Sequence, residues 1–345
     1  MQEYQYKTFS LKTHQSNWQK NNPNICQFEL TFGCGLHCRH CYTDCYNKPS
    51  LLKKELKTNQ VKALLDKIYS AGVIWMCFTG GDPLTRPDFL EIYDYAKQKG
   101  FIITLFTNGY SMTQKIVTYL AKKPPFVIEL TLNAATKDVY DKITQVKGSF
   151  EKTLEGIDLM QRAGLEVKIK TQVTKDNLKE LPRIKKYIQG LGLRFKPSVI
   201  LQARLNGNRF PCELRLSPQE VLNFNGRRKQ ILADDCQAGF HQEDAGGLFN
   251  CAIGGGDGMH IDPCGNMIPC LCIREPKVSV IKEDVSLARD KLLDWIRVQR
   301  FHNGSLCKVC DVRSRCGRCP GKALLETGDK EAVIPYFCEL AKAIL

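Results

Sequence analysis

The stretch CQFELTFGCGLHCRHCY, residues 26–42, joins an apolar strand-like run to three cysteines, Cys34, Cys38 and Cys41, in a C-x3-C-x2-C pattern. Three thiolates can hold a four-iron, four-sulfur cluster and leave one iron without a protein ligand. A small molecule can coordinate that open iron through an amine and a carboxylate, whereas a cluster with four cysteines only transfers electrons. A zinc site and buried structural thiols are the alternatives for closely spaced cysteines. The pattern favours a reactive iron-sulfur site.

Two more apolar runs end in residues that suit a ligand site. The turn GGDP at 80–83 follows the apolar run 73–79, and TNG at 107–109 follows 101–106. Each turn is common by itself. Ligands bind at the carboxyl ends of parallel strands, however, so the two turns together indicate one site at that edge of a sheet.

Strand-like and helix-like segments alternate along the chain, which is typical of a parallel sheet built from βα units. Between the strands, apolar residues recur at three- and four-residue spacing, as at Val61, Leu64, Leu65 and Ile68, and mark the buried face of a helix. The expected fold class is therefore α/β. Strands are predicted near residues 26–31, 73–79, 101–106, 126–132, 166–173 and 193–199.

The composition gives 345 residues, 17 cysteines and a formal net charge of +14. The length suits two domains. The polar start and the lack of a long apolar run predict no signal peptide and no membrane span, so we expect a cytoplasmic protein. In a reducing compartment the cysteines favour metal binding over disulfides. The basic charge fits an acidic partner; nucleic acid is less favoured, because no Lys/Arg block is interleaved with aromatic residues.

These motifs resemble those of the radical S-adenosylmethionine (SAM) superfamily. Its C-x3-C-x2-C-aromatic motif matches Cys34, Cys38, Cys41 and Tyr42, and its GGEP motif matches residues 80–83. The resemblance implies a partial (β/α)6 TIM-like barrel in which the three cysteines hold a [4Fe-4S] cluster that binds SAM. One departure is that Asp replaces the usual Glu at position 82 and is one methylene shorter.

The same resemblance implies which residues contact SAM. Asp82 is expected at the methionine amine, directly or through water, and Asn133 near the ribose. Thr144 stands where relatives have a carboxylate-binding Arg, and Lys168 or Lys170 is expected to compensate. The expected cofactor-binding residues are Tyr42, Gly80, Gly81, Asp82, Pro83, Asn108 and Asn133.

The cysteines after residue 250 resemble those of the SPASM extension of radical SAM enzymes, which holds two auxiliary four-iron clusters. The resemblance implies that the first auxiliary cluster is held by Cys251, Cys270 and Cys319. It implies that the second is held by Cys307, Cys310, Cys316 and Cys338. The expected total is three [4Fe-4S] clusters. Ligands from distant segments would tie a small domain together.

Two features of this region depart from the family pattern. Two residues separate Cys316 from Cys319 where relatives have three, and a fourth ligand of the first auxiliary cluster is not assigned. Cys272, two residues after Cys270, and Cys264, in an expected hairpin turn, are both candidates, and an open iron is a third alternative. The compact four-cysteine pattern also allows a zinc knuckle.

The remaining cysteines and histidines have weaker assignments. Cys26 and Cys77 are expected to be small core residues, and Cys45 is an alternative ligand that the family order disfavours. His37 and His40 are expected to face outward from the cysteine loop. No catalytic residue is identified outright, and the candidates are Cys212, Cys236 and Cys272.

The chain is expected to divide into four segments. Residues 1–24 form a polar N-terminal extension without a helical stripe, and 25–205 the barrel. Residues 206–249, rich in Gly, Asn, Asp and Gln, form a connector, and 250–345 the SPASM domain. Because the N-terminal extension is too short for a leader-binding domain, a leader-bearing peptide is expected either to be carried by a separate leader-binding protein or to be recognised through the barrel mouth and the basic surface. The expected electron donor is of the flavodoxin or ferredoxin type.

The resemblance implies an enzyme that cleaves SAM reductively to a 5′-deoxyadenosyl radical, which abstracts hydrogen from a substrate. SPASM relatives most often modify peptides or proteins, by crosslinking or epimerisation, so this is the first expectation. Sulfatase maturation is less favoured because Leu271, not Asp, follows Cys270. Tetrapyrrole or cofactor biosynthesis is the alternative among enzymes, and a non-catalytic iron-sulfur or zinc adaptor is the alternative outside them.

Overall fold

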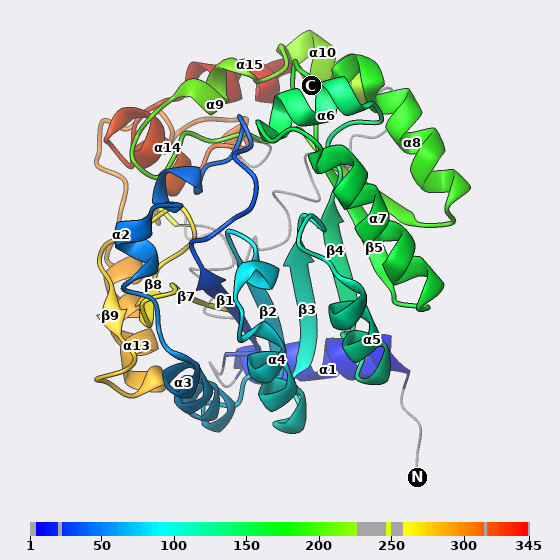
Figure 1. The fold of residues 1–345 in the computed structure, drawn as a ribbon. Helices are drawn as coiled ribbons and strands as arrows, with labels where there is room; N and C mark the ends of the chain where they lie inside the picture. Colours follow the sequence, from blue (N-terminus) through cyan, green and yellow to red (C-terminus); the bar gives the residue numbers. More distant parts are fainter. Residues whose placement is uncertain (1–4, 20–22, 226–245, 250–257, 314–315, 344–345) are drawn as a thin grey trace.

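The computed structural model describes residues 5–19, 23–225, 246–249, 258–313 and 316–343. Within them, one nine-stranded sheet runs in the order β6-β5-β4-β3-β2-β1-β7-β8-β9. Strands β1 to β6 are parallel and curve into a partial barrel with helices on the outside (Figure 1), which confirms the expected fold class. The six expected strands are present as β1 Ile25–Thr31, β2 Trp75–Gly80, β3 Ile102–Thr107, β4 Val127–Thr131, β5 Val167–Gln172 and β6 Arg194–Ser198.

Helices between these strands bury an apolar stripe against the outer face of the barrel. In α3, Thr58–Ser70, the buried residues are the expected Val61, Leu64, Leu65 and Ile68. No helix in the described ranges is long and apolar enough to cross a bilayer. The long helices are α3 Thr58–Ser70, α4 Phe89–Gln98, α5 Gln114–Lys122, α6 Lys137–Thr144, α7 Ser149–Arg162 and α8 Leu181–Gly190. The short ones are α2 Pro49–Leu52, η1 Asp44–Tyr46, η2 Pro83–Thr85 and η3 Leu178–Glu180.

Strand residues alternate between this helix layer and a polar barrel interior. In β3, Ile103 and Leu105 are fully buried in the core, whereas Phe106 lies on the opposite face. On that face the ammonium of Lys170 lies 3.7 Å from the centre of the Phe106 ring and pairs with the carboxylate of Glu129. Apolar packing therefore lies outside the strands, and charged groups lie inside them.

Lys168 and Lys170, expected to bind a cofactor carboxylate, are both paired with Glu129. The Lys168 Nζ lies 3.3 Å from Glu129 Oε1. Burial raises the pKa of Glu129, but the ammonium groups of Lys170 and Lys168 outweigh burial and hold this pKa below its usual value. A protein carboxylate thus occupies both lysines.

The sheet continues from the barrel into the cysteine-rich region. Strand β7, Gly258–Ile261, pairs in parallel with β1, and β8, Asn266–Ile268, and β9, Val278–Ser279, follow as antiparallel strands. Helix α13, Val285–Arg297, buries Val285, Ala288 and Leu292 in the same core cluster as the barrel. The division at residue 250 stays a prediction, but a backbone ladder joins the segments on either side of it.

A buried ion pair joins the segment after β6 to the C-terminal helices. Arg215 Nη1 and Nη2 lie 3.0 and 2.6 Å from the carboxylate oxygens of Glu326, and its guanidinium lies over the rings of Tyr336 and Phe337. This contact places the C-terminal helices beside the barrel mouth (Figure 1). The helices involved are α9 Phe210–Glu213, α10 Pro218–Asn225, α14 Pro320–Thr327 and α15 Pro335–Ala343.

Residues 1–24, expected to be a polar extension without a helical stripe, contain the helix α1, Tyr6–Gln19. This helix lies across the end of the barrel opposite the cysteine loop (Figure 1). The ring of His14 stacks on Trp75 at 4.6 Å, Trp75 Nε1 donates a hydrogen bond to Tyr6 Oη at 3.0 Å, and the Tyr6 ring packs on Phe126 at 4.5 Å. The helix depends on contacts with distant strands, which an apolar periodicity does not reveal.

The ends of β1 and β2 approach so closely that only glycine fits between them. A Cβ on Gly80, whose φ is +133°, would lie 2.2 Å from the carbonyl oxygen of Thr31. A Cβ on Gly81 would lie 2.2 Å from the carbonyl oxygen of Gly33, in the first residues of the cysteine loop. The backbone of this turn therefore supports the cysteine loop directly.

Gly81→Ala is expected to lower the free energy of unfolding by at least about 2 kcal/mol, because its methyl group meets rigid backbone. Gly190→Ala is the matched control: its Cβ would meet nothing within 4 Å, and φ at Gly190 is not positive. The control is expected to gain about 0.5 kcal/mol from reduced chain entropy. Urea unfolding measures both. Equal stability of the two variants would contradict the close approach.

Candidate functional site

The loop after β1 places Cys34, Cys38 and Cys41 over the carboxyl ends of the strands (Figure 1). The three thiols lie close enough for the charge of each to affect the others. Burial, followed by the nearby carboxylate of Asp82, raises the pKa of Cys34 to about 12. Burial also raises the pKa values of Cys38 and Cys41. Binding of iron would displace the thiol protons, so these residues fit a cluster that neutralises three thiolates.

Side chains that no motif identified hold the loop in place. Asn47 Nδ2 donates to the Cys34 carbonyl oxygen at 2.9 Å, and Asn47 Oδ1 accepts from the Cys34 amide at 3.4 Å. Arg39 Nη1 lies 2.8 Å from both carboxylate oxygens of Asp176. The sequence separation of 137 residues in the second pair leaves no local signal that would have predicted it.

Thr144, expected in the place of a carboxylate-binding Arg, is buried and has a structural contact. Its Oγ1 lies 2.7 Å from Ser149 Oγ and donates to the carbonyl oxygen of Tyr140 at 3.0 Å. Its carbonyl oxygen accepts from the His37 amide of the cysteine loop at 2.9 Å. Thr144 therefore anchors the loop to α6.

Asp82 is fully buried, and protein donors occupy both of its carboxylate oxygens. Oδ1 accepts from the Leu84 amide at 2.9 Å, and Oδ2 accepts from Thr107 Oγ1 and the Asn108 amide, both at 2.8 Å. Burial raises the pKa of Asp82, while these hydrogen bonds lower it. Asp82 thus joins the end of β2 to the end of β3. Its expected contact with a methionine amine stays a prediction.

Asn108 and Pro83 complete this edge of the sheet. Asn108 Nδ2 donates to Cys34 Sγ at 3.4 Å, and Asn108 Oδ1 accepts from the Tyr110 amide at 2.9 Å. Pro83 begins η2 and is buried. The turns GGDP and TNG, far apart in the sequence, therefore meet beside the cysteine loop.

The two histidines of the loop differ. His37 is exposed, as expected, and its Nδ1 lies 2.9 Å from Asp44. The outward placement expected for His40 is wrong: burial lowers the pKa of its imidazole to about 4, and its Nε2 lies 3.5 Å from Nδ2 of Asn133. Asn133, expected near a ribose, is 2% exposed, and its Oδ1 accepts from the Gln172 amide at 2.9 Å.

Tyr42 lies between the cysteine loop and the C-terminal region. Its side chain is partly buried. Burial raises the pKa of its hydroxyl well above the usual value, with further contributions from Glu29 and Cys272. Its carbonyl oxygen accepts from the Leu205 amide at 2.9 Å. The charges of Cys41 and Cys272 both raise the pKa of the Tyr42 hydroxyl. Tyr42 is therefore near two separate groups of cysteines.

The C-terminal region contains two further groups of thiols. Cys307, Cys310, Cys316 and Cys338 lie together. Besides burial, the charges of Cys307 and Cys310 raise the pKa of both Cys316 and Cys338, which requires that the four thiols are close. This grouping is the one expected for a single site. Cys270 likewise lies near Cys319, which is the residue just before α14. Cys251 lies outside the described residues.

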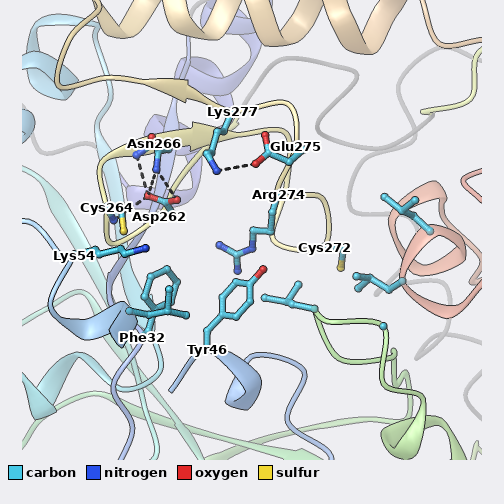
Figure 2. A pocket seen from close by; sticks show the side chains of 15 residues that line it. Phe32, Tyr46, Lys54, Asp262, Cys264, Asn266, Cys272, Arg274, Glu275 and Lys277 are labelled. Atoms are coloured by element: carbon cyan, nitrogen blue, oxygen red, sulfur yellow. Dashed lines mark hydrogen bonds and ion pairs between the residues drawn. The ribbon is translucent and has the colours of Figure 1, made fainter. Parts of the chain in front are cut away.

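A cavity of about 800 Å³ lies between the cysteine loop and the C-terminal region. In Figure 2, the guanidinium of Arg274 is near its centre, above the Tyr46 hydroxyl, and the ammonium of Lys54 points into it. Arg274 donates to both oxygens of Glu29 at 2.5 and 2.9 Å, while its buried Nε has no hydrogen-bond partner among the described residues. The lining is Phe32, Tyr46, Leu51, Lys54, Leu205, Gly207, Asp262, Cys264, Asn266, Cys272, Arg274, Glu275, Lys277, Leu324 and Leu325.

The other cysteines have ordinary surroundings. Cys26 and Cys77 are buried in strands, which confirms them as core residues. Burial raises the pKa of Cys212 to about 11, and its thiol donates to Glu326 at 3.6 Å. Cys236 lies outside the described residues.

Zinc is a poor fit to the described thiols. No three His, Cys, Asp or Glu side chains in the described ranges come close enough to hold a single metal ion. A zinc ion binds four donors about 2.0 to 2.3 Å from its centre, whereas a four-iron cluster is larger and takes more widely spaced thiolates. The three groups of cysteines are therefore compatible with clusters, without a preformed zinc site among these residues.

Sequence comparison finds relatives over the whole chain. A model of the radical SAM superfamily matches residues 28–188. The chain is similar to an AdoMet-dependent heme synthase of Nitratidesulfovibrio vulgaris, with 31% identity over 338 residues that cover 89% of this chain and 90% of that protein. A protein of the same name from Methanosarcina barkeri is 26% identical over 344 residues, covering 92% and 96%. The mycofactocin maturase MftC of Mycobacterium tuberculosis is 32% identical over 160 residues, covering 46% and 40%.

Solved structures share the fold. SuiB of Streptococcus suis bound to its precursor peptide SuiA has a TM-score of 0.69 and 17% identity, covering 96% of this chain and 80% of that one. The AdoMet-bound anSMEcpe has a TM-score of 0.65 and 15% identity, covering 93% and 96%. Identities this low establish the fold alone, whereas the family model and the whole-length relatives establish descent. The chain therefore belongs to the radical SAM superfamily of enzymes, and its C-terminal region is rich in cysteines.

Proposed function

We propose that Cys34, Cys38 and Cys41 hold a [4Fe-4S] cluster that binds SAM. The observation that supports this most strongly is the convergence of three thiols at the carboxyl edge of the strands, with the nearby Cys45 thiol donating instead to the Tyr42 carbonyl oxygen at 3.7 Å. The cluster and SAM, when bound, supply a 5′-deoxyadenosyl radical. Membership of an enzyme superfamily argues against a non-catalytic adaptor.

In this proposal the residues of the barrel edge position the cofactor. The bare backbone of Gly80 and Gly81 lets the start of the cysteine loop pack directly on this turn, and Asp82 keeps the turn fixed against Asn108. Asn133 and Tyr42 remain the proposed contacts of the nucleoside. Helices on the outer face exclude water from the reacting groups.

We further propose that Cys307, Cys310, Cys316 and Cys338 hold one auxiliary cluster and that Cys270 and Cys319, with Cys251, hold another. The gathering of the first four thiols supports this assignment. Tyr42, adjacent to Cys41 and Cys272, lies where an electron would pass between the barrel site and the auxiliary site. A flavodoxin or ferredoxin is the proposed donor.

The proposed substrate is a small molecule with carboxylate groups, and a tetrapyrrole is the first candidate. The relatives that match over their whole length are AdoMet-dependent heme synthases. The cavity supports this class, because the ammonium of Lys54 points into a volume of about 800 Å³, within the usual range for small-molecule sites. Arg274 and Lys277 also line it and pair with Glu29 and Glu275.

A ribosomally made peptide, the first expectation from the sequence, is the second candidate. The mycofactocin maturase MftC supports it, but over 46% of this chain only. Both candidates are tested with the anaerobically reconstituted enzyme, a chemical reductant and SAM. Iron coproporphyrin III is expected to stimulate formation of 5′-deoxyadenosine and to lose mass. If it stays unchanged while a peptide encoded beside this gene is modified, the tetrapyrrole proposal is wrong.

Lys54→Ala is expected to raise KM for iron coproporphyrin III about 5- to 30-fold with little change in kcat, since a charge-assisted hydrogen bond contributes roughly 1 to 2 kcal/mol. Lys53→Ala is the control, because Lys53 is exposed beside it and does not line the cavity. Initial rates at varied substrate concentration give both constants. Identical KM values for the two variants would exclude the cavity as the carboxylate site.

The single variants Cys34→Ala, Cys38→Ala and Cys41→Ala are each expected to abolish reductive cleavage of SAM, because a three-cysteine site has no spare thiolate. Cys45→Ala is the control and is expected to keep cleavage, since its thiol is directed to a backbone carbonyl. Chromatography of 5′-deoxyadenosine measures the product. A Cys45 variant that loses its cluster while the Cys34 variant retains it would show that the ligand register is wrong.

A further inference from the structure

Cys272 has the surroundings of a metal ligand, although the family resemblance assigns it no role. The chain makes a tight turn after Cys270, where the Ile273 amide donates to the Cys270 carbonyl oxygen at 3.1 Å. This turn directs the thiols of Cys270 and Cys272 to the same side, where they hydrogen-bond to each other. Neither residue belongs to a regular strand.

The first turn of α14 packs directly against these two thiols. A Cβ on Gly321 would lie 2.8 Å from the Cys272 Cβ and 3.7 Å from the Cys270 Sγ, so the glycine permits the approach. Cys319 caps the same helix, and its Sγ accepts from the Lys322 amide at 3.4 Å. Cys319 thus faces the pair from the helix N-terminus, where the helix dipole stabilises negative charge.

Positive side chains surround this group of three thiols. Lys322 lies close to both Cys272 and Cys319, and Arg274 lies close to Cys272 on the cavity side. Lys322 is itself fixed, because its Nζ donates to the Gly317 carbonyl oxygen at 2.8 Å. Anionic sulfur ligands are stabilised in such surroundings.

Cys264, the other candidate, lies elsewhere. It is in the turn between β7 and β8, where its amide donates to Asp262 Oδ1 at 2.9 Å. The charges that act most strongly on its thiol are those of Asp262, Glu55, Lys54 and Lys277. Figure 2 shows Cys264 and Cys272 on opposite sides of the cavity. One site cannot include both thiols in this arrangement.

We propose that Cys272 is an iron ligand at the auxiliary site of Cys270 and Cys319, and that Cys264 is not. This inference rests on the proposed function, which assigns Cys270 and Cys319 to that site. Because Cys272 lines the cavity, its thiolate would close the cluster site on the side that a ligand in the cavity meets. A cluster held in this way would supply electron transfer and would not bind substrate through iron.

The test compares Cys272→Ala and Cys272→Ser with Cys264→Ala in the full-length protein after anaerobic reconstitution. Wild-type protein and the Cys264 variant are expected to bind about twelve irons. Each Cys272 variant is expected either to lose about four of these irons or to show, after mild oxidation, the electron paramagnetic resonance signal of a three-iron cluster. Both Cys272 variants are expected to retain SAM cleavage, since the barrel cysteines are intact. Serine keeps the size of the side chain and guards against misfolding.

Iron content and spectra of the Cys272 variants that match wild type would overturn the inference, as would loss of a cluster from the Cys264 variant. Neither result affects the proposed function if wild-type protein binds iron and cleaves SAM. Wild-type protein that binds no iron would overturn the proposed function and this inference together. Retained SAM cleavage separates a local ligand loss from a general failure of assembly.

Discussion

The contact between the ends of β1 and β2 is the constraint on which the site depends. The carbonyl oxygen of Thr31, in β1, lies 2.2 Å from where a Cβ on Gly80 would be. The carbonyl oxygen of Gly33, in the cysteine loop, lies 2.2 Å from where a Cβ on Gly81 would be. Any side chain there would lift the loop from the sheet. Asp82 extends the same contact to β3 through Thr107 and Asn108. Three strand ends are thereby held at one level, which gives the cysteine loop a rigid base.

The barrel combines an apolar outside with a charged inside. A continuous core lies between strands and helices, so the fold needs no apolar packing in its interior. Glu129 pairs with both Lys168 and Lys170 there, and Arg274 pairs with Glu29 nearer the cavity. Such pairs contribute little net stability once desolvation is included. They leave polar groups facing a space in which a substrate with its own charges can be bound.

The sequence predicted what local patterns encode and missed what distant contacts create. Apolar runs located the six strands, and the resemblance to the SPASM extension implied the group of Cys307, Cys310, Cys316 and Cys338. Helix α1 was missed because its stability comes from Trp75 and Phe126. The inward turn of His40 and the Asn47 clamp on Cys34 were missed because neither follows a periodicity. The choice between Cys264 and Cys272 required the positions of two turns relative to α14.

The pairing of β7 with β1 has a consequence for how such a protein can be rearranged. Strand β1 has β2 on one side and β7 on the other, so it is an interior strand only when both regions are present. A barrel separated from the region after residue 257 would expose the backbone donors and acceptors of β1 along one edge. Exposed edges of this kind recruit strands from other molecules and lead to aggregation. Exchange of the cysteine-rich region between related enzymes would therefore preserve solubility only if the incoming segment brings a strand that fits β1.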